Sequence, residues 1–349
     1  MDMPDIAVTG AAGLVGQPLV QLLVAHPDVG RVVGFDVREP ARRPRSAEFH
    51  RVDIAGTRLA PLMHGIDVVV HLAGVVDPIP DEFLMARVNI GGTRQVLDAA
   101  AAVGATRVVR VSSATVYGAW SNNPVPLTED CTLRPNPDYS PAVQGAEVER
   151  LLAEWHRERP DVVTTTLRSA PVVGPGAERL PARILLGRPP LRVRGSAPPV
   201  QVVHVDDLVS ALALAAATDL PGVYNVAADG WLSADAARAL SGRTNVPAVP
   251  EEVLTRALRR AWALGVGDVP PGVVPYLVNP WVIANDLLRA AGWQPRHTNE
   301  QAIREGVATL LETRTGSRTS VVAGATAGVA AVTVVAVGRH RRRRRRARG

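Results

Sequence analysis

Three glycines and one aspartate near the N-terminus form the clearest chemical pattern in this chain. Gly10, Gly13 and Gly16 recur at every third position between a short apolar run and a helix-like segment, and Asp36 follows the last glycine by twenty residues. Glycine lets the backbone turn tightly and approach a diphosphate, which the free N–H groups of a helix start can bind. A carboxylate at position 36 would accept hydrogen bonds from ribose hydroxyls and repel a 2′-phosphate. The pattern predicts a dinucleotide site that favours NAD.

Weaker patterns leave alternatives open. The glycines could form a purely structural turn, and Arg38 leaves some use of NADP open. His204, Asp206 and Asp207 could form an acid–base set, but polar residues at a loop-to-helix junction usually cap the helix, and we favour that structural interpretation. His71 at a strand end is expected to pack or hydrogen-bond, and Tyr117 to be structural.

The elements that would position these residues alternate between strand and helix. Residues 6–9, 31–36, 67–72 and 107–111 are β-branched runs, and residues 14–25 and 89–102 between them have helical apolar spacing. Parallel neighbours need crossover helices, so the fold class is α/β, a Rossmann-type doubly wound parallel sheet. After residue 168 the rhythm loosens into Pro/Gly-rich stretches, with helices expected near 205–217, 233–241 and 251–264. We predict a dinucleotide-binding domain over 1–167, a smaller and partly interleaved substrate lobe over 168–312, and a C-terminal segment over 313–349.

Composition limits the classes of partner. The last eleven residues contain eight arginines, and the formal net charge of the chain is +6. The chain without these arginines therefore carries a net charge of 6 − 8 = −2 and has no global attraction for nucleic acid. All 39 basic residues are arginine. The single cysteine, Cys131, excludes an intramolecular disulfide, fits a reducing compartment and gives no metal pattern.

Eight motifs, in order, resemble the extended short-chain dehydrogenases/reductases, the family of NAD-dependent epimerases and dehydratases. They are TGAAGLVG (9–16), VDI (52–54), HLAG (71–74), VNIGGT (88–93), VSSATVYG (111–118), LRSAPVVGPG (167–176), HVDDL (204–208) and GWQP (292–295). The resemblance covers about residues 5–310. It implies cofactor contacts at Leu14, Val15, Asp53, Ile54, Leu72, Ala73, Gly74 and Asn89 beside Gly10, Gly13, Gly16 and Asp36, with Ser113 and Tyr139 as the catalytic hydroxyls. It also implies a homodimer.

One family residue is missing. In these enzymes a lysine four residues after the tyrosine lowers the tyrosine pKa and holds the nicotinamide ribose, but Val143 stands there and the chain has no lysine. A free tyrosine titrates near ~10 and needs a positive charge to act as a base. Arg150 and Arg157 on the following helix could reach in. Ser140-Pro141 predicts that the helix starts just after Tyr139.

Eighteen uncharged residues, 321–338, precede the arginine cluster. A helix of that length spans about 27 Å, barely a bilayer core. We favour a membrane anchor, or a surface-lying segment with its arginines on anionic lipid, over a flexible polyanion-binding extension. The body would then be a cytoplasmic domain attached to the membrane through this tail.

Two functions follow. The first is an NAD-dependent oxidoreductase or epimerase acting on a small molecule, a nucleotide-sugar or a similar secondary alcohol, through Ser113 and Tyr139. The second is a catalytically degenerate NAD(H)-binding sensor or scaffold at the membrane, which Val143 and the absent lysine favour.

Overall fold

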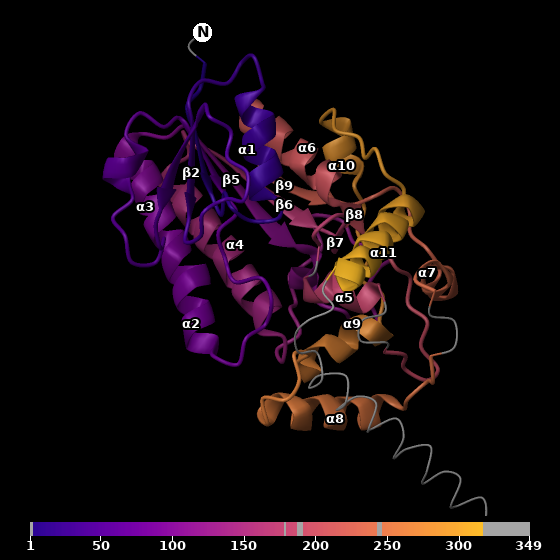
Figure 1. Cartoon of the computed structure of the whole chain (residues 1–349). Helices are drawn as coiled ribbons and strands as arrows, with labels where there is room; N and C mark the ends of the chain where they lie inside the picture. The colour runs from indigo at the N-terminus through magenta and orange to yellow at the C-terminus, as the bar shows by residue number, and fades with distance from the viewer. Residues whose placement is uncertain (1–2, 178, 187–190, 243–245, 317–349) are drawn as a thin grey trace, which may run out of the picture.

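Seven strands form a central sheet in the computed structural model, in which every neighbouring pair is parallel (Figure 1). They are β1 (Ile6–Thr9), β2 (Val32–Asp36), β3 (Ala47–Arg51), β4 (Val68–His71), β5 (Arg107–Ser113), β6 (Val163–Ser169) and β9 (Gly222–Val226), in the order β3-β2-β1-β4-β5-β6-β9. The order reverses direction at β1, which makes the sheet doubly wound and opens a crevice at the carboxyl ends of β1 and β4. The predicted fold class is confirmed for the residues that the structure describes: 3–177, 179–186, 191–242 and 246–316, with backbone alone at 181 and 310–316.

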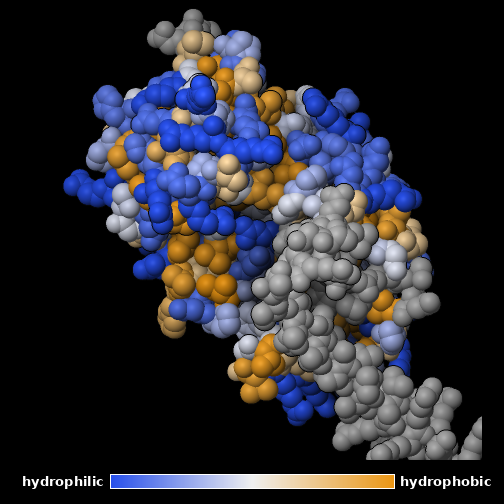
Figure 2. Space-filling view, in the orientation of Figure 1, coloured by the Kyte–Doolittle hydropathy of each residue, from blue (hydrophilic) through white to orange (hydrophobic). Residues whose placement is uncertain are grey.

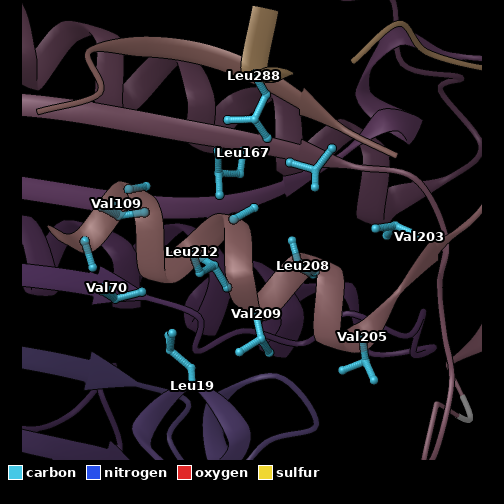
Figure 3. Close-up of a cluster of buried hydrophobic side chains, with 14 of the residues drawn as sticks. Leu19, Val70, Val109, Leu167, Val203, Val205, Leu208, Val209, Leu212 and Leu288 are labelled. Carbon is cyan, nitrogen blue, oxygen red and sulfur yellow. The ribbon is translucent and has the colours of Figure 1, made fainter. Parts of the chain in front are cut away.

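Helices cover both faces of this sheet. The long ones are α1 (Gly16–Val24), α3 (Gly92–Val103), α4 (Ser140–Glu158) and α6 (Val205–Ala217). Alternate residues of one strand point to opposite faces, so Val70 packs with α1 and α6, whereas Val69 packs with α3 and α4. Figure 3 shows the first of these two cores, in which Leu19 of α1 and Leu212 of α6 meet the sheet.

The remaining elements lie mostly in the second half of the chain, and all except α8 and α11 are short. They are the α-helices α2 (Glu82–Ala86), α5 (Leu180–Leu185), α7 (Ala234–Leu240), α8 (Glu251–Ala263), α9 (Val274–Val278), α10 (Asp286–Ala290) and α11 (Asn299–Gly316); the 3-10 helices η1 (Ala60–Met63), η3 (Ala114–Tyr117) and η4 (Pro271–Val273); the π-helix η2 (Arg87–Gly91); and the strand pair β7 (Val172–Val173) and β8 (Val203–His204). The chain after residue 168 also contributes β9 to the central sheet and α6 to the helices that pack on it.

His204, Asp206 and Asp207 serve the fold. The Nδ1 of His204 accepts a hydrogen bond from the Asp206 N–H at 3.2 Å and so caps α6. The fully buried carboxylate of Asp207 accepts from the backbone N–H groups of Arg296 and His297 at 2.9 and 3.0 Å. These bonds tie α6 to the loop before α11, as the structural interpretation predicts.

The predicted membrane segment, 321–338, and the arginine cluster lie outside the described residues. Within the described ranges, none of the helices has both the length and the apolar character needed to cross a bilayer.

Candidate functional site

The glycine loop connects β1 to α1 in a conformation that leaves no room for a Cβ atom at two of its glycines. Gly10 has φ +71°, and a Cβ there would lie 2.8 Å from the Ala73 backbone nitrogen. A Cβ on Gly16 would lie 2.1 Å from the Gly10 carbonyl oxygen, which accepts a hydrogen bond from the Gly13 N–H at 2.9 Å. The loop therefore folds tightly against the segment after β4 and presents the start of α1 to the crevice.

Asp36 ends β2 beside this loop and is almost fully buried. Its two carboxylate oxygens accept hydrogen bonds, each of 3.0 Å, from the N–H groups of Ala12 and Arg38. These bonds hold the carboxylate at the crevice with further acceptor capacity for a ribose hydroxyl. Asp53 lies after β3, where its Oδ1 accepts from the Ala55 N–H at 2.9 Å.

A chain of hydrogen bonds crosses from β1 to α3 beneath the crevice. The Thr9 hydroxyl accepts from two backbone N–H groups after β4, so it donates to the Nδ1 of His71 at 2.8 Å. The His71 Nε2 then donates to the Thr93 hydroxyl at 2.9 Å, which donates to the Asn89 carbonyl oxygen. Burial, with a smaller contribution from Arg110, lowers the pKa of His71 to about 3. His71 is neutral and structural, as expected.

Asn89 lies in η2 and ties three segments together. Its Oδ1 accepts from the Val75 N–H at 2.7 Å, and its Nδ2 donates to the Val75 carbonyl and to the Gln144 Oε1 at 3.1 and 3.0 Å. Gly74 leaves the space for this contact, because a Cβ there would lie 3.2 Å from the Asn89 Oδ1. The loop after β4 is thereby held against the start of α4.

Ser113 and Tyr139 supply two hydroxyl groups near the carboxyl end of β5. The Ser113 Oγ accepts from the Thr115 N–H and hydroxyl at 3.2 and 3.0 Å, so its own proton is available to a ligand. Tyr139 directly precedes α4 and is 2% exposed. Burial and the nearby Asp77 both raise the pKa of Tyr139 above its usual value. The Tyr139 hydroxyl therefore keeps its proton at neutral pH.

Tyr117 is buried away from this pair, as predicted. Its hydroxyl donates to the Asn225 Oδ1 at 2.8 Å and accepts from the Arg168 Nη1 at 2.7 Å. Burial raises the pKa of Tyr117 to about 12, although Arg168 acts in the opposite direction.

One cleft of about 680 Å³ gathers the residues that the sequence singles out. Its walls include Gly10, Gly13, Leu14, Val15, Gly16, Asp36, Asp53, Ile54, Leu72, Ala73, Gly74, Asn89, Ser113 and Tyr139. The sequence analysis did not foresee four further lining residues with charged or amide side chains: Asp77, Arg110, Gln144 and Arg179. Only Arg110 carried a signal, since it is a charged residue inside an otherwise apolar strand.

The position that the family gives to lysine does not face the cleft. Val143 is 38% exposed and is not among the residues that line the cleft. Apolar side chains gather on the surface over α2 (Figure 2). The cleft is instead lined from α4 by Pro141, Gln144, Gly145 and Val148, which carry no ionisable group.

The expectation that Arg150 or Arg157 reaches into the cleft is wrong. The Arg150 guanidinium is mostly exposed and pairs with Glu147 and Glu154 at 2.5 and 2.9 Å. Arg157 is more exposed still and lies 4.0 Å from Glu154. Both arginines point from the outer surface of α4, because they are out of phase with the cleft-lining positions. Ser140 is the first residue of α4, so the helix begins directly after Tyr139, close to the predicted start.

Comparison with known proteins agrees with this architecture. Residues 6–227 match the model of the NAD dependent epimerase/dehydratase family. An uncharacterised protein of Mycobacterium tuberculosis is 31% identical over 251 residues, which cover 69% of this chain and 67% of that protein. A 3-diazoavenalumate denitrifying reductase of a Streptomyces species is 30% identical over 320 residues, which cover 84% of this chain and 96% of the relative.

Solved structures share the fold. The protein MoeE5, in complex with UDP-glucuronic acid and NAD, superposes with a TM-score of 0.69 at 23% identity, covering 88% of this chain and 99% of MoeE5. The family match spans most of the chain and contains the glycine loop, Asp36 and Ser113. The chain therefore belongs to the NAD dependent epimerase/dehydratase family.

Proposed function

We propose that the cleft binds NAD and that the chain is an NAD-dependent oxidoreductase of the epimerase type, acting on a nucleotide-sugar or a similar secondary alcohol or its ketone. The observation that carries this proposal is the convergence of the glycine loop, Asp36 and the two hydroxyls of Ser113 and Tyr139 on one cleft. Its volume of about 680 Å³ lies within the range of about 300–1,000 Å³ that is usual for cofactor and ligand sites.

The described residues fit a dinucleotide. Gly13 leaves open space beside the start of α1, where a diphosphate would meet free N–H groups. Asp36 lies one strand away from that loop, where its carboxylate would accept hydrogen bonds from the adenosine ribose hydroxyls. When bound, NAD supplies the hydride chemistry, and the protein supplies position and proton control.

The two hydroxyls favour the reductive direction. Ser113 has a free proton, and Tyr139 keeps its proton because its pKa is raised. Two hydrogen-bond donors stabilise the negative charge that develops on a carbonyl oxygen during its reduction. Removal of a proton from an alcohol would instead need a tyrosinate, which burial and Asp77 oppose. The Streptomyces relative, whose name describes a reductase, supports the same direction.

The substrate side of the cleft is built by the chain after residue 168, which we infer to be the substrate lobe. Pro171, Arg179 and Trp281 line the cleft there. A smaller hollow of about 80 Å³ shares Pro171 and Trp281 with it, and its walls include Arg192 and Arg238. Arginines beside a cleft suit the diphosphate of a nucleotide-sugar, and MoeE5 is named as binding UDP-glucuronic acid.

Turnover by the purified full chain tests the proposal. UDP-glucose and UDP-glucuronic acid with NAD, and their 4-keto products with NADH, are followed by NADH absorbance and product analysis. Tyr139→Phe is expected to lower kcat at least about 100-fold while the Kd for NAD stays unchanged. The matched control is Tyr224→Phe. Tyr224 lies on β9 away from the cleft, and its hydroxyl donates a hydrogen bond to the Pro221 carbonyl oxygen. Equal turnover by wild type and Tyr139→Phe would reject the role of Tyr139.

A second candidate is an NAD(H)-binding protein that has lost catalysis. The observation that favours it is the uncharged cleft-facing side of α4, formed by Pro141, Gln144, Gly145 and Val148. The structure assigns the informative variant to position 144 rather than 143, because Val143 points outward. A large gain in hydride transfer by Gln144→Lys would indicate a degenerate native site, and Val143→Lys serves as the matched control that adds the same charge on the surface.

A further inference from the structure

Arg110 is a charged side chain in the cleft, and among the described residues it has no hydrogen-bond or ion-pair partner. It lies in β5, and its Nη1 is buried without a hydrogen bond. No described group accepts a hydrogen bond from its other nitrogens, and no described carboxylate lies within 4 Å of it. Leaving a guanidinium unpaired in the interior costs free energy, so its place at a ligand cleft calls for an explanation.

The groups near Arg110 are already committed to other partners. Glu149 is the acid that acts on Arg110 through space, but its carboxylate is held by Arg168 at 2.7 Å and by the Ser112 hydroxyl at 2.5 Å. Both ring nitrogens of His71 are used by Thr9 and a second threonine. The positive charge of Arg110 is therefore left for a ligand that lies in the cleft.

The sheet order indicates which part of a dinucleotide would meet Arg110. Asp36 lies on β2, one strand to one side of the glycine loop, and Arg110 lies on β5, two strands to the other side. Strands are about 4.8 Å apart, so Arg110 is about 10 Å from the loop across the sheet. If the diphosphate lies at the loop and the adenosine at Asp36, the half beyond the diphosphate passes β4 and β5.

We propose that Arg110 binds the hydroxyls of the ribose that carries the nicotinamide, and so supplies from the sheet the cation that the cleft-facing side of α4 lacks. The residue is paired in register with His71 of β4 and lies three residues before Ser113 on the same strand. It shares its face of β5 with Ser112, whose hydroxyl contacts α4. The assignment rests on the proposed NAD binding, and it names the residue that holds the reactive half of the cofactor.

Three probes separate this contact from general electrostatics. ADP contains the adenosine and the diphosphate only, ADP-ribose adds the second ribose, and NAD adds the nicotinamide. Titration calorimetry of the full chain measures Kd for each. Arg110→Met is expected to raise the Kd for NAD and for ADP-ribose by about 10- to 100-fold, which corresponds to the loss of one or two charge-assisted hydrogen bonds. The Kd for ADP should change by less than about twofold. Arg110→Lys should restore part of the loss.

The controls decide between ligand binding and folding. Arg94→Met, on the exposed side of α3, should leave all three Kd values unchanged. Ligand-free Arg110→Met should unfold at the same temperature as wild type or higher, since it removes an uncompensated charge. Equal losses for ADP and ADP-ribose, unchanged binding of all three, or a variant that fails to fold would each overturn the assignment. Wild type that binds none of the probes would instead refute the proposed NAD site itself.

Discussion

Gly13→Ala tests the phosphate loop most directly. The new methyl group would lie 3.0 Å from the Gly10 carbonyl oxygen and would otherwise project into open space. Gly13 is not among the glycines with positive φ, so alanine can adopt its backbone conformation. The free energy of unfolding should therefore change little, because a shift of a few tenths of an ångström relieves the contact.

Binding should respond much more strongly than stability. A methyl group at position 13 would hold a diphosphate away from the start of α1 and weaken one or two hydrogen bonds to a charged group. Each is worth about 1.5–3 kcal/mol, which corresponds to a rise in the Kd for NAD of about 10- to 150-fold. Calorimetric titration with NAD measures this change, and urea unfolding measures stability on the same samples.

Two other glycine variants serve as comparisons for the effects on binding and on stability. In Gly16→Ala the new Cβ would lie 2.1 Å from a backbone oxygen, so both the Kd and the stability should worsen, the latter by about 1–3 kcal/mol. In Gly91→Ala, outside the cleft lining and with no atom within 4 Å of the new Cβ, neither should worsen. If Gly13→Ala binds NAD as tightly as wild type, the diphosphate does not approach this loop and the reasoning fails.

Three further outcomes are expected. Asp36→Ala should weaken the binding of NAD about tenfold and raise the affinity for NADP relative to NAD, because it removes the carboxylate that accepts from the ribose and repels a 2′-phosphate. Competition titrations measure this ratio of affinities, and an unchanged ratio would contradict the role of Asp36. Arg168→Met should lower the free energy of unfolding by about 3–5 kcal/mol, since it leaves the buried Glu149 carboxylate without its cation. In the same urea titration Arg150→Met, on the surface, should leave the free energy of unfolding nearly unchanged. The His71 pKa of about 3 lies below its unfolded value of 6.5, so its contribution to stability is complete above pH 6.5 and falls as the pH drops toward 3. Wild type should lose about 2 kcal/mol through this group between pH 7 and 5, and a His71→Asn variant whose stability falls as steeply would refute the assignment.

The cofactor side of the site could be predicted from the sequence because its signals are local. The glycine spacing, the first two β-branched runs and Asp36 at a strand end all lie within about forty residues, and each strand–helix junction fixes where its side chains emerge. The structure brings them to one cleft at the point where the strand order reverses.

The rotation of α4 could not be predicted in the same way. Counting four residues from Tyr139 leads to Val143, but the buried side of α4 is set by Val148, Leu152 and the Glu149–Arg168 pair. That pair joins residues 19 positions apart on neighbouring elements, which no local pattern encodes. The cleft therefore receives Gln144 and Gly145 instead of Val143.

Arg110 shows a related limit. A charged residue in the run RVVRV is visible in the sequence, but its lack of a partner depends on which groups Glu149 and His71 already bind. Those commitments involve strands and helices far apart in the chain, so they emerge only from tertiary structure.

The chain returns to the central sheet at β9, so the part after residue 168 completes the sheet that begins in the first half. β9 pairs with β6 from Thr165 to Ser169, and α6 covers the core under β4 and β5. A chain cut after residue 167 would leave an unpaired sheet edge and an uncovered apolar face. The parts of the chain before and after this point share one core, so exchanging either part alone between relatives would disturb the β6–β9 pairing and the packing of α6.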